Sequence, residues 1–105
     1  MPQLSAIVIT RNEAANIGAC LDSVAFCDER IVVDCGSTDA TVEIARQKGA
    51  RVEYHEWRGF GPQKNYALSL ASGTWVLSLD ADEQVTAELA AAIKDAIKND
   101  SADAY

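Results

Sequence analysis

Four short apolar runs alternate along the chain with segments whose apolar residues recur at helical spacing. The runs lie at residues 4–10, 31–33, 51–55 and 75–79. The first is almost continuously apolar and β-branched, which is typical of a strand buried on both faces of a parallel sheet. The third alternates between apolar and polar positions, as a more exposed strand does. The pattern therefore predicts four strands.

Each predicted strand is followed by a predicted helix. The first helix carries one apolar stripe at i, i+3, i+4 and i+7, formed by Ile17, Cys20, Leu21 and Val24. The later helices are expected at residues 40–48, 62–72 and 86–98, with Gly49 as a left-handed C-cap and Pro62 in a first turn. The order βαβαβαβα with short connections predicts an α/β fold with a Rossmann-like, doubly wound, mostly parallel sheet.

Composition fits one packed domain over residues 1–105. The chain is 49% hydrophobic and 24% charged, which is typical of a globular domain. No apolar run approaches the roughly 20 residues needed to span a bilayer, and the first residues lack the basic and apolar regions of a signal peptide. We therefore expect a cytoplasmic protein.

Charge and cysteine content exclude several function classes. A net charge of −7 argues against nonspecific binding to nucleic acid or to anionic lipid, and a phosphate ligand would need a local offset of that charge. Three cysteines without a CxxC pair argue against a disulfide framework and a structural zinc site. We expect reduced thiols and no nucleic-acid partner.

The three most polar loops all follow predicted strands. They span residues 10–13, 34–39 and 80–83. Ligands of open parallel sheets bind outside the carboxyl ends of the strands, at the point where the strand order reverses. The coincidence of three polar loops at these ends predicts a ligand site there.

The loop after the fourth strand contains two aspartates separated by one residue. Asp80 and Asp82 could hold one hard divalent cation, Mg²⁺ or Mn²⁺, with positions left open for phosphate oxygens. The alternative is that Asp82 and Glu83 only complement the N-terminal dipole of the last helix. The sequence leaves both interpretations open.

Two other candidates also have structural alternatives. Asp34 could accept hydrogen bonds from a nucleotide base or ribose, or it could belong to the turn that Gly36 permits. Lys64, expected in the first turn of the third helix, could bind an anion there or be solvated in a surface loop.

For His55, the only histidine, a structural role is favoured. The GxxxxGK[ST] and GxGxxG patterns are absent, which argues against an ATPase and an ordinary nicotinamide enzyme.

Four segments in order, SAIVITRNE, IVVDCGSTD, GFGPQKNYAL and ASGTWVLSLDADE, resemble the amino-terminal, nucleotide-sugar-binding half of family 2 glycosyltransferases. The resemblance covers residues 4 to about 97 and implies a GT-A fold. It is closer to the bacterial lipopolysaccharide-core β-glucosyltransferases, in which WRGF is similarly followed by a Gln-basic-Asn helix start. The chain departs from many members by having Arg11 in place of an aromatic residue and Cys35 in place of a second acidic residue.

The resemblance also implies roles for individual residues. Thr10 and Arg11 would flank the nucleotide base, and Lys64 would lie near the base or the diphosphate. Asp34 would lie in the loop that recognises uracil. Asp80 would contact ribose or metal, and Asp82 would be the principal metal ligand. The nucleotide-sugar-binding residues implied are Thr10, Arg11, Asn12, Glu13, Asp34, Gly36, Lys64, Asp80 and Ala81, with Asp80 and Asp82 as metal ligands.

The activity implied is inverting, divalent-metal-dependent transfer of a sugar, expected to be glucose, from a UDP-sugar. The acceptor would be a saccharide or lipid-linked saccharide in lipopolysaccharide core biosynthesis, with the enzyme at the inner face of the cytoplasmic membrane. The family usually supplies the general base from beyond the DxD segment, so we expect that base beyond Tyr105. The chain would then be the donor half of a larger protein, inactive alone and prone to self-association along the strand at residues 75–79.

Other classes of protein share parts of this pattern. A nucleotidyltransferase normally has a glycine-rich basic loop after the first strand, which TRNEAANIG does not provide. A receiver-type signalling domain needs an acidic pair after the first strand and an aspartate after the third, and neither is present. A noncatalytic nucleotide-binding domain remains open as an alternative.

Overall fold

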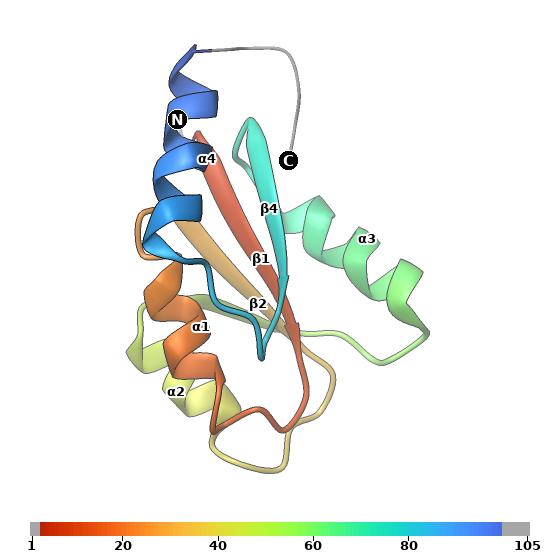
Figure 1. Ribbon diagram of the computed structural model, residues 1–105. Helices are drawn as coiled ribbons and strands as arrows, with labels where there is room; N and C mark the ends of the chain where they lie inside the picture. The colour runs from red at the N-terminus through yellow and green to blue at the C-terminus, as the bar shows by residue number, and fades with distance from the viewer. Residues whose placement is uncertain (1–2, 100–105) are drawn as a thin grey trace.

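The computed structural model describes residues 3–99, which fold around one parallel sheet (Figure 1). Its strands are β1 (Leu4–Thr10), β2 (Glu29–Asp34), β3 (Arg51–Tyr54) and β4 (Trp75–Asp80). They pair in the order β3-β2-β1-β4, and all three pairings are parallel. The strand order therefore reverses beside β1, and the predicted parallel sheet is confirmed.

Helices cover both faces of the sheet. They are α1 (Ile17–Ser23), α2 (Thr41–Gln47), α3 (Phe60–Leu70) and α4 (Ala87–Asn99). In Figure 1, α1, α2 and α4 lie on one side of the sheet and α3 lies on the other. The predicted doubly wound α/β architecture is thereby confirmed.

Alternating side chains of β1 enter two separate cores. Leu4, Ala6 and Val8 pack with the stripe of α1 and with α4, whereas Ile7 packs with apolar residues of β2 and α3. All these side chains are buried, as is the whole predicted stripe of α1. The run at residues 4–10 is almost continuously apolar because both faces of β1 are covered.

The third helix begins earlier than the sequence predicted. α3 starts at Phe60, its N-cap is Gly59 with φ 104°, and the amide of Gln63 donates to the carbonyl of Gly59 at 3.2 Å. Pro62 therefore lies inside the first turn, where a missing amide hydrogen costs no helical hydrogen bond. As a result Lys64 lies in the second turn, and its expected position in the first turn was wrong.

The carboxylate of Glu29 makes several contacts at the end of the sheet opposite the polar loops. Glu29 accepts hydrogen bonds from the hydroxyl of Ser5 at 2.6 Å and from the amide of Ser72 at 2.6 Å. The hydroxyl of Ser5 accepts in turn from the amide of Gly73 at 2.8 Å. A Cβ at Gly73 would lie 2.6 Å from the Ser5 Oγ and 2.8 Å from its backbone nitrogen, so this position needs glycine for close approach.

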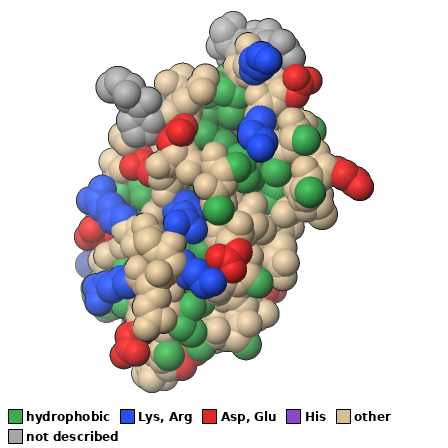
Figure 2. All heavy atoms as spheres, turned by 90° about the vertical axis from the view of Figure 1, so that its left-hand side faces the viewer, with side chains coloured by type: hydrophobic (Ala, Val, Ile, Leu, Met, Phe, Trp, Pro, Cys, Tyr) green, Lys and Arg blue, Asp and Glu red, His purple; other side chains and the backbone are tan. Residues whose placement is uncertain are grey.

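The layer of helices α1, α2 and α4 has a mixed surface. Figure 2 shows basic and acidic side chains interleaved on this face, with apolar side chains between them. No helix within residues 3–99 has the length and apolar character that crossing a membrane requires.

Candidate functional site

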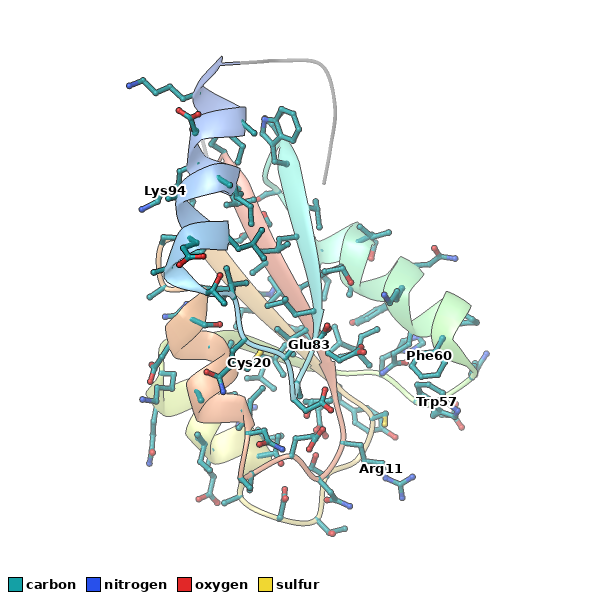
Figure 3. All side chains as sticks on the ribbon, viewed as in Figure 1. Arg11, Cys20, Trp57, Phe60, Glu83 and Lys94 are labelled. Carbon is teal, nitrogen blue, oxygen red and sulfur yellow. The ribbon has the colours of Figure 1, made fainter. Side chains whose placement is uncertain are left out.

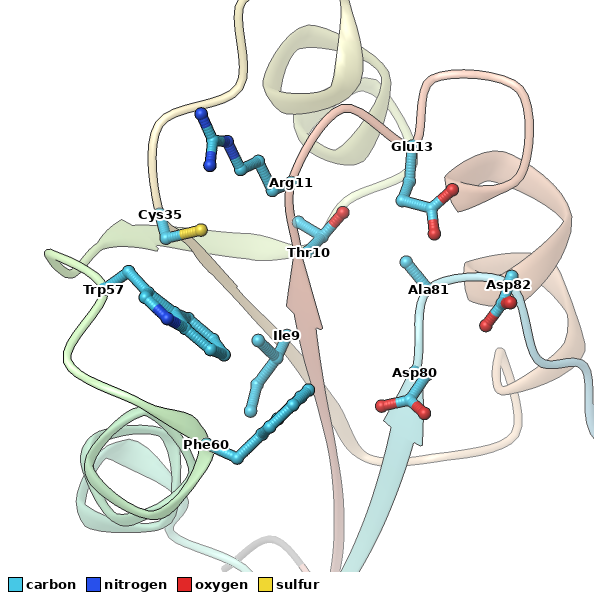
Figure 4. A pocket seen from close by; sticks show the side chains of 10 residues that line it. All are labelled: Ile9, Thr10, Arg11, Glu13, Cys35, Trp57, Phe60, Asp80, Ala81 and Asp82. Carbon is cyan, nitrogen blue, oxygen red and sulfur yellow. The ribbon is translucent and has the colours of Figure 1, made fainter.

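A cavity of about 410 Å³ lies where the strand order reverses, outside the carboxyl ends of β1 and β4. The register places Thr10 beside Asp34 and Ile9 beside Asp80, so the three polar loops begin at one edge of the sheet. The residues that line the cavity are Ile9, Thr10, Arg11, Glu13, Cys35, Trp57, Phe60, Asp80, Ala81 and Asp82 (Figure 4).

The hydroxyl of Thr10 is buried beside this cavity without a hydrogen-bond partner. Thr10 is only 3% exposed, and its Oγ1 is the one buried side-chain nitrogen or oxygen within residues 3–99 that lacks a partner. Leaving a polar atom unsatisfied costs about 1–3 kcal/mol. A ligand that hydrogen bonds to Oγ1 would recover that free energy.

One side of the cavity is acidic. Figure 4 shows Glu13, Asp80 and Asp82 around Ala81, on one side of β1. The carboxylate of Glu83 accepts a hydrogen bond from the amide of Asp80 at 2.7 Å, which closes the turn after β4. Asp80 and Asp82 themselves are exposed. Glu83 therefore does more than interact with the dipole of the last helix, because its carboxylate accepts this hydrogen bond within the turn.

The electrostatic effect of these carboxylates reaches a neighbouring thiol. Burial, as the largest cause, and the negative charges of Glu83, Asp82, Asp80 and Glu13 together raise the pKa of the Cys20 thiol to about 11. The thiol also donates to the carbonyl of Asp80 at 3.7 Å. An anionic ligand at this end of the sheet would meet strong repulsion unless a cation came with it.

The donor atoms on the acidic side fit a hard divalent cation. Asp80 and Asp82 offer carboxylate oxygens, which Mg²⁺ and Mn²⁺ prefer. Within residues 3–99 no cluster of three or more His, Cys, Asp or Glu side chains is arranged to hold a metal ion. Two aspartates alone would leave coordination positions open for oxygens of a ligand.

Asp34 is engaged with its own loop and does not line the cavity. Its buried carboxylate accepts hydrogen bonds from the amide of Gly36 at 2.9 Å, the amide of Ser37 at 2.8 Å and the hydroxyl of Ser37. Gly36 has φ 117°, which favours glycine. The structure thus accounts for both residues by the turn, and contact with a ligand stays a prediction.

Asn12 and Glu13 connect the loop after β1 to the loop after β2. Asn12 has φ 54°, and its backbone amide donates a hydrogen bond to the Ser37 hydroxyl at 2.8 Å. The amide of Glu13 donates to the Thr41 hydroxyl at 2.9 Å. Of these two predicted binding residues, only Glu13 lines the cavity.

Arg11 is the one basic side chain among the lining residues. Lys64 is exposed on α3 and is not part of the lining. The structure therefore brings together six of the predicted site residues and leaves four outside. Those in the lining are Thr10, Arg11, Glu13, Asp80, Ala81 and Asp82; those outside are Asn12, Asp34, Gly36 and Lys64.

The sequence did not single out the aromatic side of the cavity. Trp57 and Phe60 line it from the loop before α3 and from the first residue of that helix. In the sequence the segment WRGF contributes only to the family resemblance, and its two large apolar side chains in a polar stretch are the available signal. Ile9 and Cys35 complete this side.

His55 has the structural role that was favoured for it. Its Nδ1 lies 2.8 Å from Oε1 of the buried Gln63, and its ring stacks on Tyr66 with centroids 4.3 Å apart. The side-chain amide of Gln63 donates to the His55 carbonyl at 3.2 Å. These contacts fix the loop after β3 against α3.

Comparison with known proteins places the chain in a family. Residues 5–105 match the model of glycosyl transferase family 2. The chain belongs to that family. The resemblance recognised in the sequence is thereby confirmed.

Two bacterial relatives of this family 2 chain are about three times as long as it is. An uncharacterised glycosyltransferase of Rickettsia felis is 49% identical over 90 residues, covering 85% of this chain and 32% of the relative. The lipopolysaccharide core biosynthesis glycosyltransferase LpsC of Rhizobium meliloti is 39% identical over 87 residues, covering 78% of this chain and 32% of LpsC. The chain thus spans about a third of the length of these relatives.

Solved structures of glycosyltransferases share its fold. The mannosyltransferase PcManGT of Pyrobaculum calidifontis, in complex with GDP-Man and Mn²⁺, is 34% identical with a TM-score of 0.72, covering 89% of this chain and 32% of that one. Glucosyl-3-phosphoglycerate synthase of Mycobacterium tuberculosis, in complex with Mn²⁺, UDP and glucosyl-3-phosphoglycerate, is 29% identical with a TM-score of 0.69, covering 79% and 36%. The family 2 chain therefore shares the GT-A fold of these glycosyltransferases over about a third of their length.

Proposed function

We propose that the cavity binds the nucleoside diphosphate part of a UDP-sugar together with Mg²⁺ or Mn²⁺, and that the protein transfers the sugar to a saccharide or lipid-linked saccharide acceptor. The observation that carries this proposal is that a buried hydroxyl group and two carboxylates lie at one cavity beside the end of β1. A buried hydroxyl without a partner, Thr10 Oγ1, belongs to the same cavity as two exposed carboxylates that can bind a cation, those of Asp80 and Asp82.

Different residues of the cavity would bind different parts of the ligand. Asp80 and Asp82 would hold the cation, and Thr10 would donate its hydroxyl hydrogen to an oxygen of the nucleotide. Arg11, the one basic side chain that lines the cavity, would add positive charge beside the ligand. When bound, the divalent cation neutralises charge that develops on the leaving diphosphate.

The donor assignment has support of two kinds. The M. tuberculosis neighbour was solved with UDP and Mn²⁺, and the P. calidifontis neighbour with GDP-Man and Mn²⁺, so both pair a nucleoside diphosphate with manganese. The sequence resemblance favours UDP and glucose. The similarity to LpsC supports a role in lipopolysaccharide core biosynthesis.

The acceptor side belongs to the same proposal. Inverting transfer needs a general base that takes the proton of the attacking hydroxyl. We assign this base to no residue within 3–99 and propose that it lies beyond Tyr105, as the family resemblance implies. We also propose a cytoplasmic location at the inner face of the membrane, which is consistent with the three cysteines being free thiols.

The outer edge of β4 could join two copies of the chain. β4 pairs with β1 on one side, and within residues 3–99 no strand pairs with its other side. Unpaired backbone groups on an edge strand invite pairing with another chain. Light scattering over a range of concentrations should therefore give masses above that of the monomer, and a monomeric mass throughout would reject self-association.

Titration calorimetry with UDP tests the proposed function. We expect binding that requires Mn²⁺ or Mg²⁺ and that is no stronger for UTP than for UDP. A nucleotidyltransferase would favour the triphosphate. The absence of metal-dependent UDP binding would reject the proposal.

A further inference from the structure

Two large aromatic side chains line the cavity and pack in neither hydrophobic core. Trp57 is 45% exposed and Phe60 is 65% exposed, and neither belongs to the two apolar clusters that hold the helices on the sheet. Exposed aromatic surface of this size costs free energy in water unless something covers it. The pair therefore calls for an explanation other than packing.

The two rings form a defined pair. Their centroids are 5.0 Å apart with an interplanar angle of 84°, an edge-to-face contact. Figure 3 shows them beside the start of α3, away from Cys20 and Glu83. In Figure 4 both side chains point toward Ile9, on the side of β1 opposite Asp80.

The backbone that carries the pair is anchored at both ends. Before Trp57, the ring of His55 stacks on Tyr66 and its Nδ1 contacts the buried Gln63. After it, Phe60 is already the first residue of α3. The rings are thus presented to the cavity by a loop with fixed ends, which lowers the entropy lost when a ligand binds.

We propose that Trp57 and Phe60 form an aromatic platform that stacks on the planar base of the nucleotide. This inference rests on the proposed function and assigns residues to the part of the ligand farthest from the cation. If Asp80 and Asp82 hold the cation and diphosphate, the base is separated from them by the ribose. It therefore reaches the opposite side of the cavity, where the aromatic rings, Ile9 and Cys35 form an apolar surface.

Matched variants can separate stacking from the other parts of binding. Trp57→Leu and Phe60→Leu remove a π-face and keep an apolar side chain, whereas Trp57→Phe keeps a smaller face. Tyr54→Leu is the control, because Tyr54 is 66% exposed and does not line the cavity. The ligands are UDP, UDP-glucose and inorganic pyrophosphate, each with Mn²⁺, measured by calorimetry with thermal unfolding as the check on folding.

Stacking of a base on an aromatic side chain predicts a loss of about tenfold or more in UDP affinity for Trp57→Leu, with a smaller loss for Trp57→Phe. Pyrophosphate affinity should be unchanged in all variants, and Tyr54→Leu should match the original chain. The chain has two tryptophans, and Trp75 is buried at the start of β4, so UDP should quench the fluorescence of Trp57 selectively.

Three other results would overturn the inference. If the original chain binds UDP with Mn²⁺ but Trp57→Leu and Phe60→Leu bind it equally well, the platform is wrong and the proposed function stands. If only UDP-glucose loses affinity, the rings contact the sugar and not the base. If the original chain shows no metal-dependent UDP binding, the proposed function fails and the platform fails with it.

Discussion

The side-chain oxygen of Asn12 accepts a hydrogen bond from the backbone amide of Thr38 at 2.7 Å. This contact joins the loop after β1 to the loop after β2, which are 26 residues apart in sequence. The same oxygen lies 3.3 Å from the Thr38 hydroxyl. Asn12 thus acts on the cavity indirectly, by holding the segment that presents Thr10 and Arg11.

Replacing Asn12 should therefore reduce stability. Asn12→Ala removes the acceptor and places alanine at φ 54°, where asparagine is tolerated better. We expect the free energy of unfolding to fall by about 1–3 kcal/mol. Asn12→Asp keeps an acceptor oxygen and should lose much less. Urea denaturation that gave equal free energies for both variants and the original chain would contradict this role.

Thr10 should show opposite effects on stability and on binding. Thr10→Val removes the unpaired buried hydroxyl while keeping the shape, so the free energy of unfolding should stay equal or rise, by up to about 1–3 kcal/mol. UDP affinity in Mn²⁺ should fall by about tenfold, because the hydrogen bond to the ligand is lost. Thr10→Ser retains the hydroxyl and should bind normally. Unchanged affinity in Thr10→Val would mean that Oγ1 does not meet the nucleotide.

Acid should weaken the end of the sheet held by Glu29. Burial alone would raise the pKa of Glu29, but hydrogen bonds from Ser5 and Ser72 outweigh it and hold the pKa below the ordinary value of 4.5. A lowered folded-state pKa stabilises the fold above about pH 4.5 and loses that contribution as the pH falls through the folded-state value. Glu29→Gln should therefore be less stable at pH 7 and show a shallower loss of stability from about pH 5 to pH 3.

The control for that experiment is Glu56→Gln. Glu56 is exposed and forms a surface ion pair with Arg58 at 3.1 Å, which contributes little. The unfolding free energy of the Glu56→Gln variant should depend on pH in the same way as that of the original chain. If the unfolding free energy of Glu29→Gln also had the pH dependence of the original chain, the hydrogen bonds to Glu29 would not be a source of acid sensitivity.

The fold could be predicted from the sequence because its strongest signals are local. The continuous apolar run of β1 requires cover on both faces, and the stripe on α1 has the spacing of a helix on a sheet. The acidic side of the cavity was also predictable, since Asp80 ends the strand that pairs with β1 at the switch point and Asp82 lies in the turn after it.

Other parts of the site depend on directions of side chains that spacing does not encode. Asp34 satisfies the amides of its own turn, and nothing in its position distinguishes that from contact with a ligand. The start of α3 was misplaced because proline is tolerated throughout a first turn, not only at its beginning. Trp57 and Phe60 line the cavity together with Ile9 of β1, a tertiary arrangement that spacing along the sequence does not encode.

Calorimetric titration of UDP in Mn²⁺ with the Asp82→Asn variant measures the central claim most directly. We expect that Asp82→Asn abolishes the metal-dependent binding, that Asp80→Asn reduces it less, and that all variants unfold at similar temperatures, because both carboxylates are exposed. Glu88→Gln removes an exposed acidic side chain from the first turn of α4, outside the cavity, and should bind as the original chain does. Unchanged Mn²⁺-dependent UDP affinity in Asp82→Asn would contradict the claim that Asp80 and Asp82 hold the cation and the diphosphate.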